Sequence, residues 1–353
     1  MTVMQKRPWE GMQGYTEVNS AQLPMIDDET PTFMGVPLAH DQQQLKCADV
    51  AIIGAPYVAG AAGKYAGVDK TEWVLAPRRV RQQSARYPTG YLQEFDFDVL
   101  QELNVVDMGD ALIPSDANEN PNAENILIAQ AAVELMVNKA LDSGAIPVVI
   151  GQNSPCGSYA IAKPIAERSN GSVGMISTDT HWDSRPIDHL TNDKRIAGSG
   201  NWKSKTYRDH ANFSVSNLVE IGERGMLEHA DIVRWYRTRG AHFYPMWQIR
   251  GHLGIEGLCR ELKHAYKNTE DIYVHFDMDV LGGAGPAPGD ILGELAEPMG
   301  MSDYEIIRLA HEIGLRGLTG MSFICIPPGS MVIYRTIVYI ITFLLAGLVI
   351  SRQ

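Results

Sequence analysis

The segment Val173-Gly174-Met175-Ile176-Ser177-Thr178-Asp179-Thr180-His181-Trp182-Asp183 joins an apolar run to a group of charged side chains. The run at 172–177 is short and apolar, which predicts a buried β-strand. Beyond it, Asp179, His181 and Asp183 occupy alternate positions, so an extended backbone points their side chains to the same face. Two carboxylates and an imidazole aimed at one point are suitable ligands for a divalent cation.

A second group of acidic side chains follows another predicted strand at 271–276. Asp277 and Asp279 again share a face, and the glycine- and proline-rich segment 282–289 that follows suits the rim of a pocket. Taken alone, an Asp-x-Asp pair is more often a solvated turn. Both groups, however, end predicted buried strands, where unpaired charges are costly and neighbouring carboxylates repel one another unless a cation compensates them. A metal site is therefore favoured over a purely structural role.

The rest of the chain alternates short apolar runs with helical patterns. The clearest helix is predicted at 123–141, where apolar side chains recur with helical spacing and Gly144 follows as a stop signal. Alternating strands and helices are typical of an α/β fold, a mostly parallel sheet covered by helices on both faces. Ligands of such sheets bind beyond the carboxyl ends of the strands. The other predicted strands lie at 48–54, 104–108, 146–150, 217–221 and 318–324, and further helices at 255–266 and 304–315.

Length and composition limit the organisation and the partners of the chain. No linker rich in Pro, Gly or Ser divides the 353 residues, so we predict one domain at 46–353 after an irregular arm at 1–45. The formal charge of -12 argues against a nucleic-acid partner, which needs a basic face. The four cysteines are far apart and form no Cys-x-x-Cys pair, which favours reduced thiols in the cytoplasm.

The C-terminal segment is unusually apolar. Residues 336–351 run without a charge between Arg335 and Arg352. This run is shorter than the about 20 residues of a membrane span, so a membrane anchor is disfavoured. A helix that is hydrophobic on all sides must be buried, and we predict a terminal helix buried against a partner subunit.

The two acidic motifs resemble those of the ureohydrolase family, which includes arginases and agmatinases. The likeness extends to 48–56, to 76–81 and to Ser199-Gly200-Asn201, which is similar to a substrate-loop motif of arginases. The resemblance implies a three-layer α/β/α sandwich, trimers or hexamers, and two manganese or nickel ions that activate water for attack on a guanidinium carbon. The implied metal ligands are Asp179, His181, Asp183, Asp277 and Asp279, and the substrate pocket is predicted at Ser199, Asn201, Lys203, Trp182 and Cys325.

The sequence departs from the family pattern at three positions. Ser154 stands where the family has its first metal-binding histidine, and a neutral hydroxyl is a poor replacement for imidazole. Cys325 stands where a glutamate faces the substrate guanidinium, and Lys203 lies near the place of a proton-shuttle histidine. The first metal site has thereby lost its nitrogen ligand, so we expect at most one bound ion in this chain. The second site keeps its full set of ligands: Asp179, His181, Asp277 and Asp279.

Three functions remain open for such a chain. It could be a self-sufficient hydrolase of guanidino compounds with an altered site, a supporting subunit beside an active paralogue, or a non-catalytic structural pseudoenzyme. The retained ligands argue against the third, and the loss of both the metal histidine and the glutamate argues against the first. We favour the second, because the pattern resembles a subunit of the heteromeric, nickel-dependent metformin hydrolases. Its partner would be a paralogous ureohydrolase subunit, and its substrate a small guanidine or biguanide.

Overall fold

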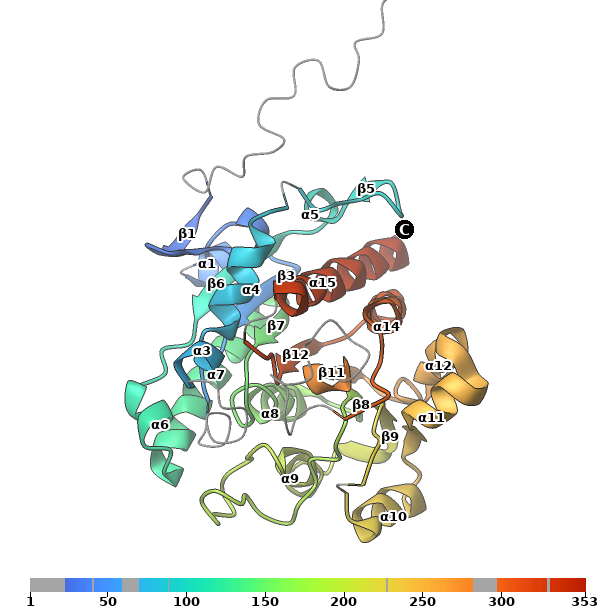
Figure 1. Cartoon of the computed structure of the whole chain (residues 1–353). Helices are drawn as coiled ribbons and strands as arrows, with labels where there is room; N and C mark the ends of the chain where they lie inside the picture. Colours follow the sequence, from blue (N-terminus) through green and yellow to red (C-terminus); the bar gives the residue numbers. More distant parts are fainter. Residues whose placement is uncertain are drawn as a thin grey trace, which may run out of the picture.

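The chain folds around a parallel sheet with helices on both of its faces (Figure 1). The computed structural model describes residues 23–39, 41–58, 70–87, 89–226, 228–281, 297–328 and 331–353. Within these ranges the central sheet has eight strands in the order β10-β9-β8-β11-β12-β7-β3-β6, and each neighbouring pair is parallel. The strands are β3 (Val50–Gly54), β6 (Val105–Asp110), β7 (Ile146–Ile150), β8 (Val173–Thr178), β9 (Phe213–Ile221), β10 (His242–Tyr244), β11 (Asp271–Asp277) and β12 (Gly320–Ile324).

This architecture confirms the predicted α/β fold. The run at 172–177 forms β8 and the run at 271–276 forms β11, whereas the short edge strand β10 has no counterpart among the predicted strands. The helix predicted at 123–141 is α7 (Ala123–Ser143). The Asn122 side chain caps it by accepting a hydrogen bond from the Asn125 amide, and Gly144 ends it with a left-handed φ of 83°.

Alternate residues along the strands face two hydrophobic layers. In β3, Val50 and Ile52 contact one layer while Ala51 and Ile53 contact the other, which is why the strand is a continuous apolar run. The first layer contains α4 (Ala76–Ser84), α5 (Val99–Glu102), α11 (Met246–Gln248), η3 (Ile249–Leu253), α12 (Gly254–Glu261), η4 (Leu262–His264), η5 (Met278–Leu281), α14 (Asp303–Arg316) and α15 (Met331–Arg352). The second contains α1 (Gln42–Leu45), α6 (Ser115–Glu119), α7, α8 (Tyr159–Arg168), α9 (Trp202–Asp209) and α10 (Ala230–Thr238).

The described part of the N-terminal arm differs from the irregular segment predicted at 1–45. It forms a hairpin of β1 (Met25–Asp27) and β2 (Thr30–Pro31), followed by η2 (Phe33–Gly35) and α1. The Phe33 side chain is buried in the first layer, and Leu38 pairs with Asp107 of β6. This part of the arm therefore packs as an integral part of the domain. Residues 1–22 of the predicted arm lie outside the described residues.

The C-terminal helix α15 is buried inside its own chain. It packs on α14, α4 and α5, beside the sheet (Figure 1). Two glycines allow the close approach to α14, because a Cβ on Gly347 would lie 2.3 Å from the His311 carbonyl oxygen and one on Gly314 would lie 2.0 Å from that of Leu344. The helix is long and apolar enough to cross a membrane, but 78% of its apolar window is buried. This corrects the predicted burial against a partner subunit, because elements of the same chain cover the helix.

Candidate metal centre

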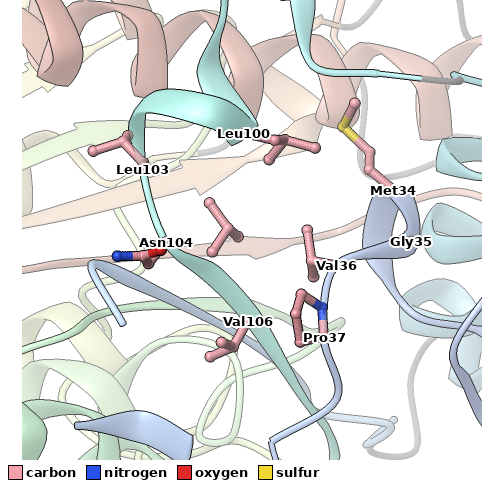
Figure 2. A pocket seen from close by; sticks show the side chains of 9 residues that line it. Met34, Gly35, Val36, Pro37, Leu100, Leu103, Asn104 and Val106 are labelled. Atoms are coloured by element: carbon pink, nitrogen blue, oxygen red, sulfur yellow. The ribbon is translucent and has the colours of Figure 1, made fainter. Parts of the chain in front are cut away.

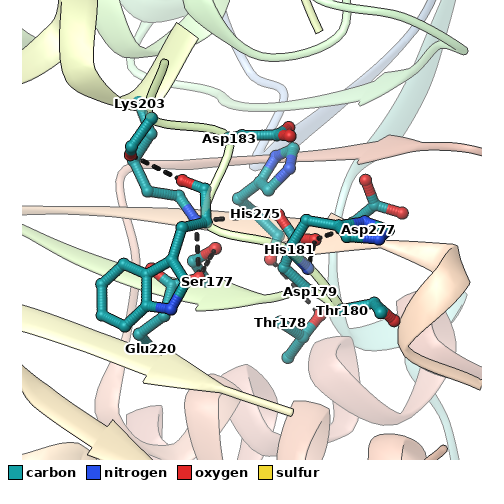
Figure 3. Close-up of polar contacts among 12 residues, drawn as sticks. Ser177, Thr178, Asp179, Thr180, His181, Asp183, Lys203, Glu220, His275 and Asp277 are labelled. Carbon is teal, nitrogen blue, oxygen red and sulfur yellow. Dashed lines mark hydrogen bonds and ion pairs between the residues drawn. The ribbon is translucent and has the colours of Figure 1, made fainter. Parts of the chain in front are cut away.

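The two acidic motifs meet at the carboxyl edge of the sheet, where β8 and β11 are neighbours (Figure 3). In their parallel register Phe276 lies opposite Thr178, so the residues that follow, Asp277 and Asp179, emerge side by side. Both carboxylates are buried, as is that of Asp279. The structure thus brings together acidic residues that are about 100 positions apart in the chain, at the edge where open parallel sheets bind ligands.

His181 lies against these carboxylates. Its Nδ1 is 3.1 Å from Asp279 Oδ2 and 4.0 Å from Asp179 Oδ1, and one ligand atom from each of the three residues lies within 4.8 Å of the others. The Thr180 amide donates to Asp279 Oδ1 at 3.0 Å and so fixes that carboxylate. Burial alone would lower the pKa of His181, but the Asp279 carboxylate raises it to about 10. Asp179, His181 and Asp279 could therefore share one cation, which would displace the imidazole proton.

Asp183 is held differently from the other predicted ligands. Its backbone has a positive φ of 44°, and its Oδ2 accepts a hydrogen bond from Trp202 Nε1 at 2.9 Å. Among the residues that the structure describes, it belongs to none of the compact three-ligand groups. Burial raises the pKa of Asp183 to about 7, against the opposing effect of the Lys203 ammonium. The charges of the centre thus act on the Asp183 carboxylate, but its Oδ2 is hydrogen-bonded to the Trp202 indole.

Lys203 is fully buried behind Asp179. Its ammonium lies 2.5 Å from Glu220 Oε1 and 3.6 Å from Asp179 Oδ2, and Ser177 donates to the same glutamate oxygen at 2.9 Å. Burial alone would lower the pKa of Lys203, but Glu220 and then Asp179 raise it, so the side chain stays charged. Two buried carboxylates thus hold the ammonium inside the protein. Glu220 was not predicted, and its position within an apolar strand gave little signal.

The other predicted pocket residues differ in exposure. Trp182 is 1% exposed and stacks on Tyr236, with ring centroids 4.7 Å apart. The alternation that turns His181 toward the carboxylates turns Trp182 toward the second hydrophobic layer. Asn201 is buried and donates to the Ile196 carbonyl at 3.1 Å, while Ser199 is half-buried in the loop before α9.

One further imidazole faces the carboxylates, that of His275 in β11. It is fully buried, and its Nε2 has no hydrogen-bond partner among the described residues. A ligand atom of His275 lies within 4.8 Å of ligand atoms of both Asp179 and Asp277. The sequence carried a signal for this residue, because His275 stands two positions before Asp277 and strand residues two apart share a face. No role was predicted for His275 from the sequence.

A comparison with known proteins identifies the family of the chain. Residues 48–342 match the Arginase family. This chain belongs to the arginase family. A formimidoylglutamase of Halobacterium salinarum is 24% identical over 285 residues, which cover 77% of this chain and 83% of that protein.

Solved structures with the arginase fold superpose over most of the chain. A hypothetical agmatinase from Burkholderia thailandensis matches with a TM-score of 0.72 at 19% identity and covers 91% of each chain. A formiminoglutamase from Trypanosoma cruzi, solved with Mn²⁺, matches with a TM-score of 0.68 at 21% identity and covers 91% of this chain and 99% of that one. These neighbours support the fold only. Their sequence identities are too low to transfer an activity to this chain.

Within this arginase-family chain, Cys325 lies at the centre itself. Its Sγ is within 4.8 Å of ligand oxygens of Asp277 and Asp279, and its backbone has a positive φ of 53°. Its amide donates to the Gln152 carbonyl at 3.0 Å, which ties the end of β12 to the end of β7. Burial and then the neighbouring carboxylates raise the pKa of the Cys325 thiol well above its ordinary value. A neutral thiol therefore borders the acidic cluster.

Ser154, at the predicted place of a metal-binding histidine, is engaged with its own loop. It is buried, and its Oγ donates to the Ser158 Oγ at 2.6 Å. The Ser158 carbonyl in turn accepts a hydrogen bond from the Tyr273 hydroxyl at 3.2 Å. Ser154 therefore belongs to the polar network beneath the carboxylates, but it belongs to none of the three-ligand groups among the described residues.

The chemistry of the cluster fits a divalent cation. Burial, and then the charges of neighbouring aspartates, raise the pKa values of Asp179 and Asp277 well above the ordinary carboxyl value. Asp179 Oδ2 and His275 Nε2 are buried without hydrogen-bond partners in the described structure. Carboxylate oxygens with imidazole nitrogens are ligands for manganese and nickel, and a bound cation would satisfy both unpaired atoms. The formiminoglutamase neighbour from Trypanosoma cruzi was solved with Mn²⁺.

A separate cavity lies at the amino end of β6, an edge strand of the sheet (Figure 2). It has a volume of about 300 Å³ and is bordered by η2, the end of α5 and the start of β6. Its lining is apolar apart from Asn104, and it contains no ionisable side chain. Because it lies at the amino end of β6, away from the carboxyl edge, it takes no part in the metal centre.

Proposed function

We propose that this chain is the supporting subunit of a metal-dependent hydrolase that cleaves a C–N bond of a small guanidine or biguanide of the metformin type. The observation that carries the supporting role is the neutral Cys325 thiol beside Asp277 and Asp279. A cationic substrate at this place would lack the carboxylate with which a guanidinium forms charge-assisted hydrogen bonds.

The fixed charge of Lys203 supports the same proposal. Its buried ammonium lies 3.6 Å from Asp179 Oδ2, behind the metal ligands. A fixed positive charge there disfavours a cationic substrate at the same carboxylates, especially where water is excluded. The active guanidine site of the complex is therefore proposed to lie in the paralogous subunit.

The chain keeps four of the predicted ligands, Asp179, His181, Asp277 and Asp279, and three of them, Asp179, His181 and Asp279, form one compact group that suits a nickel or manganese ion. A bound ion would lower the pKa of a coordinated water and stabilise negative charge that develops on the substrate. The residues of this chain would hold the ion in place, with the amides of Thr180 and Asp279 orienting the carboxylates of Asp279 and Asp277. A trimer or hexamer in the cytoplasm, mixed with the paralogous subunit, completes the proposal.

A self-sufficient hydrolase is the second candidate. Formimidoylglutamase is the name of a relative that covers 77% of this chain, and a glutamate derivative carries carboxylates of its own. Such a substrate does not need the anionic partner that Cys325 fails to provide. This candidate predicts turnover of a formimidoyl amino acid by the chain alone.

Activity of the chain alone and in combination tests both candidates. The full-length chain would be purified alone and together with its paralogous subunit, loaded with Mn²⁺ or Ni²⁺, and assayed with guanidine, agmatine, metformin and formimidoylglutamate. Activity that requires both subunits is expected. Asp279→Asn in this chain should leave most of that activity, while the corresponding change in the partner should abolish it. Full activity of this chain alone would overturn the supporting role.

A further inference from the structure

His275 has a buried ring nitrogen, Nε2, that no hydrogen bond in the described structure satisfies. The ring lies at the carboxyl end of β11, is 0% exposed, and has no hydrogen-bond partner at Nε2 among the described residues. A ligand atom of His275 lies within 4.8 Å of carboxylate oxygens of Asp179 and Asp277 (Figure 3). A buried imidazole nitrogen beside buried carboxylates, with no proton shared between them, costs free energy on both sides.

The opposite edge of the ring is held in place. Nδ1 lies 3.3 Å from the Tyr273 hydroxyl and 3.3 Å from the Ser322 Oγ, and these two hydroxyls are 2.7 Å apart. Tyr273 is anchored in turn by donating to the Ser158 carbonyl at 3.2 Å, and the Trp202 ring packs on the imidazole at a centroid distance of 4.5 Å. An imidazole that is fixed through one nitrogen and open at the other has the arrangement of a metal ligand.

The neighbouring ligand group does not use this nitrogen. Asp179, His181 and Asp279 form one compact group, and Asp179, His275 and Asp277 form another. The two groups have only Asp179 in common, so they describe two adjacent positions and not one. The second position also borders the network that contains Ser154, through Ser158 and Tyr273.

We infer that His275 binds a divalent cation through Nε2, together with oxygens of Asp179 and Asp277, and so supplies from β11 the imidazole that Ser154 does not provide. The inference rests on the metal site of the proposed function and deepens it. The chain then offers two adjacent cation positions, one with His181 and one with His275. This changes the expected number of ions, while the missing substrate carboxylate at Cys325 still assigns the chain a supporting role.

Manganese titration tests the inference without any assay of activity. The metal-free full-length chain would be titrated with Mn²⁺, with free Mn²⁺ measured by electron paramagnetic resonance. Two ions per chain are expected for the unaltered protein, and His275→Gln should lose one of them or bind it more than about 100-fold less tightly. Loss of an outer-shell hydrogen bond weakens metal binding by only about 10–100-fold, so the larger effect marks a direct ligand. Nitrogen modulation in pulsed spectra of bound Mn²⁺ should fall accordingly.

A matched control comes from His311, another histidine whose Nε2 is buried without a hydrogen-bond partner in the described structure. It stacks on Phe95 in the α14 layer, away from the carboxylates, so His311→Gln should keep both manganese ions. Adding Ser154→His to the His275→Gln variant should restore nitrogen coordination at the lost position. Thermal unfolding of each metal-free variant checks that the fold is retained.

Several outcomes would overturn the inference. His275→Gln could keep the stoichiometry, the affinity and the nitrogen coupling of the unaltered chain, or the chain could bind one ion or none. Binding of one ion that depends on His181 alone would leave the proposed function standing while removing His275 from it. Conversely, two ions that depend on His275, with no hydrolysis by any pairing of subunits, would sustain the inference and remove the proposed function.

Discussion

The sheet carries two clusters of buried charge at its carboxyl edge, and they are satisfied in opposite ways. Beside β6, the Arg81 guanidinium pairs with Asp107 through Nε and one terminal nitrogen, each at 2.9 Å, and the other terminal nitrogen lies 2.5 Å from Asp110. Asp107 also accepts from the Phe33 amide at 2.8 Å. Between β8 and β11, by contrast, Asp179 Oδ2 and His275 Nε2 have no hydrogen-bond partner in the described structure.

This difference distinguishes a structural charge cluster from a candidate cation site. The Arg81 cluster carries its own cation, and the guanidinium nitrogens reach acceptors in a fixed planar geometry, so nothing further is needed for its charges to remain buried. The β8–β11 cluster has more carboxylates than its buried ammonium, Lys203, can neutralise. An unbalanced set of buried anions with unpaired ligand atoms is what a cation site looks like before the cation binds.

The largest expected effect comes from breaking the balanced cluster. Arg81→Met leaves Asp107 buried without a cation and should lower the free energy of unfolding by about 5 kcal/mol. Urea denaturation with and without Mn²⁺ measures it, and the loss should be equal in both conditions. Arg79→Met on the same helix is the control, because its pairing with Glu72 is solvent-exposed and worth about 1 kcal/mol at most. A loss that Mn²⁺ repairs would contradict a purely structural role for Arg81.

Removing the buried ammonium of the unbalanced cluster should have a smaller effect, and one that depends on whether metal is bound. Lys203→Met deprives Glu220 and Asp179 of their ammonium and should lower the free energy of unfolding of the metal-free chain by about 3 kcal/mol. Saturation with Mn²⁺ should recover part of this loss, because the metal takes over the compensation of Asp179. The control is Lys205→Met in the same helix, α9. Lys205 pairs with the partly exposed Asp209, so its loss should lower the free energy of unfolding by about 1 kcal/mol, with no response to metal.

Metal binding itself should stabilise only one of the two clusters. At a free Mn²⁺ concentration of 100 times the dissociation constant, the folded state gains about 2.7 kcal/mol. Asp279→Asn should reduce this gain. The Arg81→Met variant is less stable without metal, but it should gain as much free energy of unfolding from Mn²⁺ as the unaltered chain does. Thermal unfolding across a manganese series, followed by addition of a chelator, measures both. Equal stabilisation of the Asp279→Asn variant and the unaltered chain would show that the metal binds elsewhere.

Much of the fold could be predicted because several of the sheet strands are short, apolar and bounded by turn residues. The runs that form β3, β7, β8 and β11 are buried on both faces and therefore lack any competing polar pattern. The placement of α15 was not predictable from its composition, since an apolar helix must be buried but its sequence does not say against what. The glycines that admit it to α14, Gly314 and Gly347, acquire meaning only when the two helices are seen to cross.

The candidate site was predictable where its residues follow strand periodicity. Asp179, His181, Asp277 and Asp279 meet as their alternation and strand ends indicate. The surroundings of Trp182 and Lys203 were not predictable, because their neighbours in space, Tyr236 and Glu220, are remote in sequence. His275 was overlooked because a histidine inside an apolar strand is more often a satisfied core residue. Only its unpaired nitrogen, which is visible in three dimensions alone, gives it a different role.

The two clusters should also respond differently to pH. Burial raises the pKa of Asp183 from 3.8 to about 7, and the Asp279 carboxylate, against the effect of burial, raises that of His181 from 6.5 to about 10. Between about pH 4 and pH 10 the folded metal-free chain therefore binds more protons at these two groups than the unfolded chain does. Its free energy of unfolding should fall as the pH rises through this window.

Bound metal should reverse this trend, because the metal replaces the protons and binds better as its ligands lose them. Urea unfolding at several values from pH 5 to pH 9, in chelator and in excess Mn²⁺, would give two curves that diverge with rising pH. Asp183→Asn combined with His181→Gln should flatten the curve in chelator. The cost of Arg81→Met should be the same in chelator and in excess Mn²⁺ at each pH, since Asp107 and Asp110 lie outside the cluster that binds the metal. A cost that Mn²⁺ reduced would mean that the two clusters are coupled through the sheet, and the contrast between a balanced and an unbalanced cluster would no longer hold.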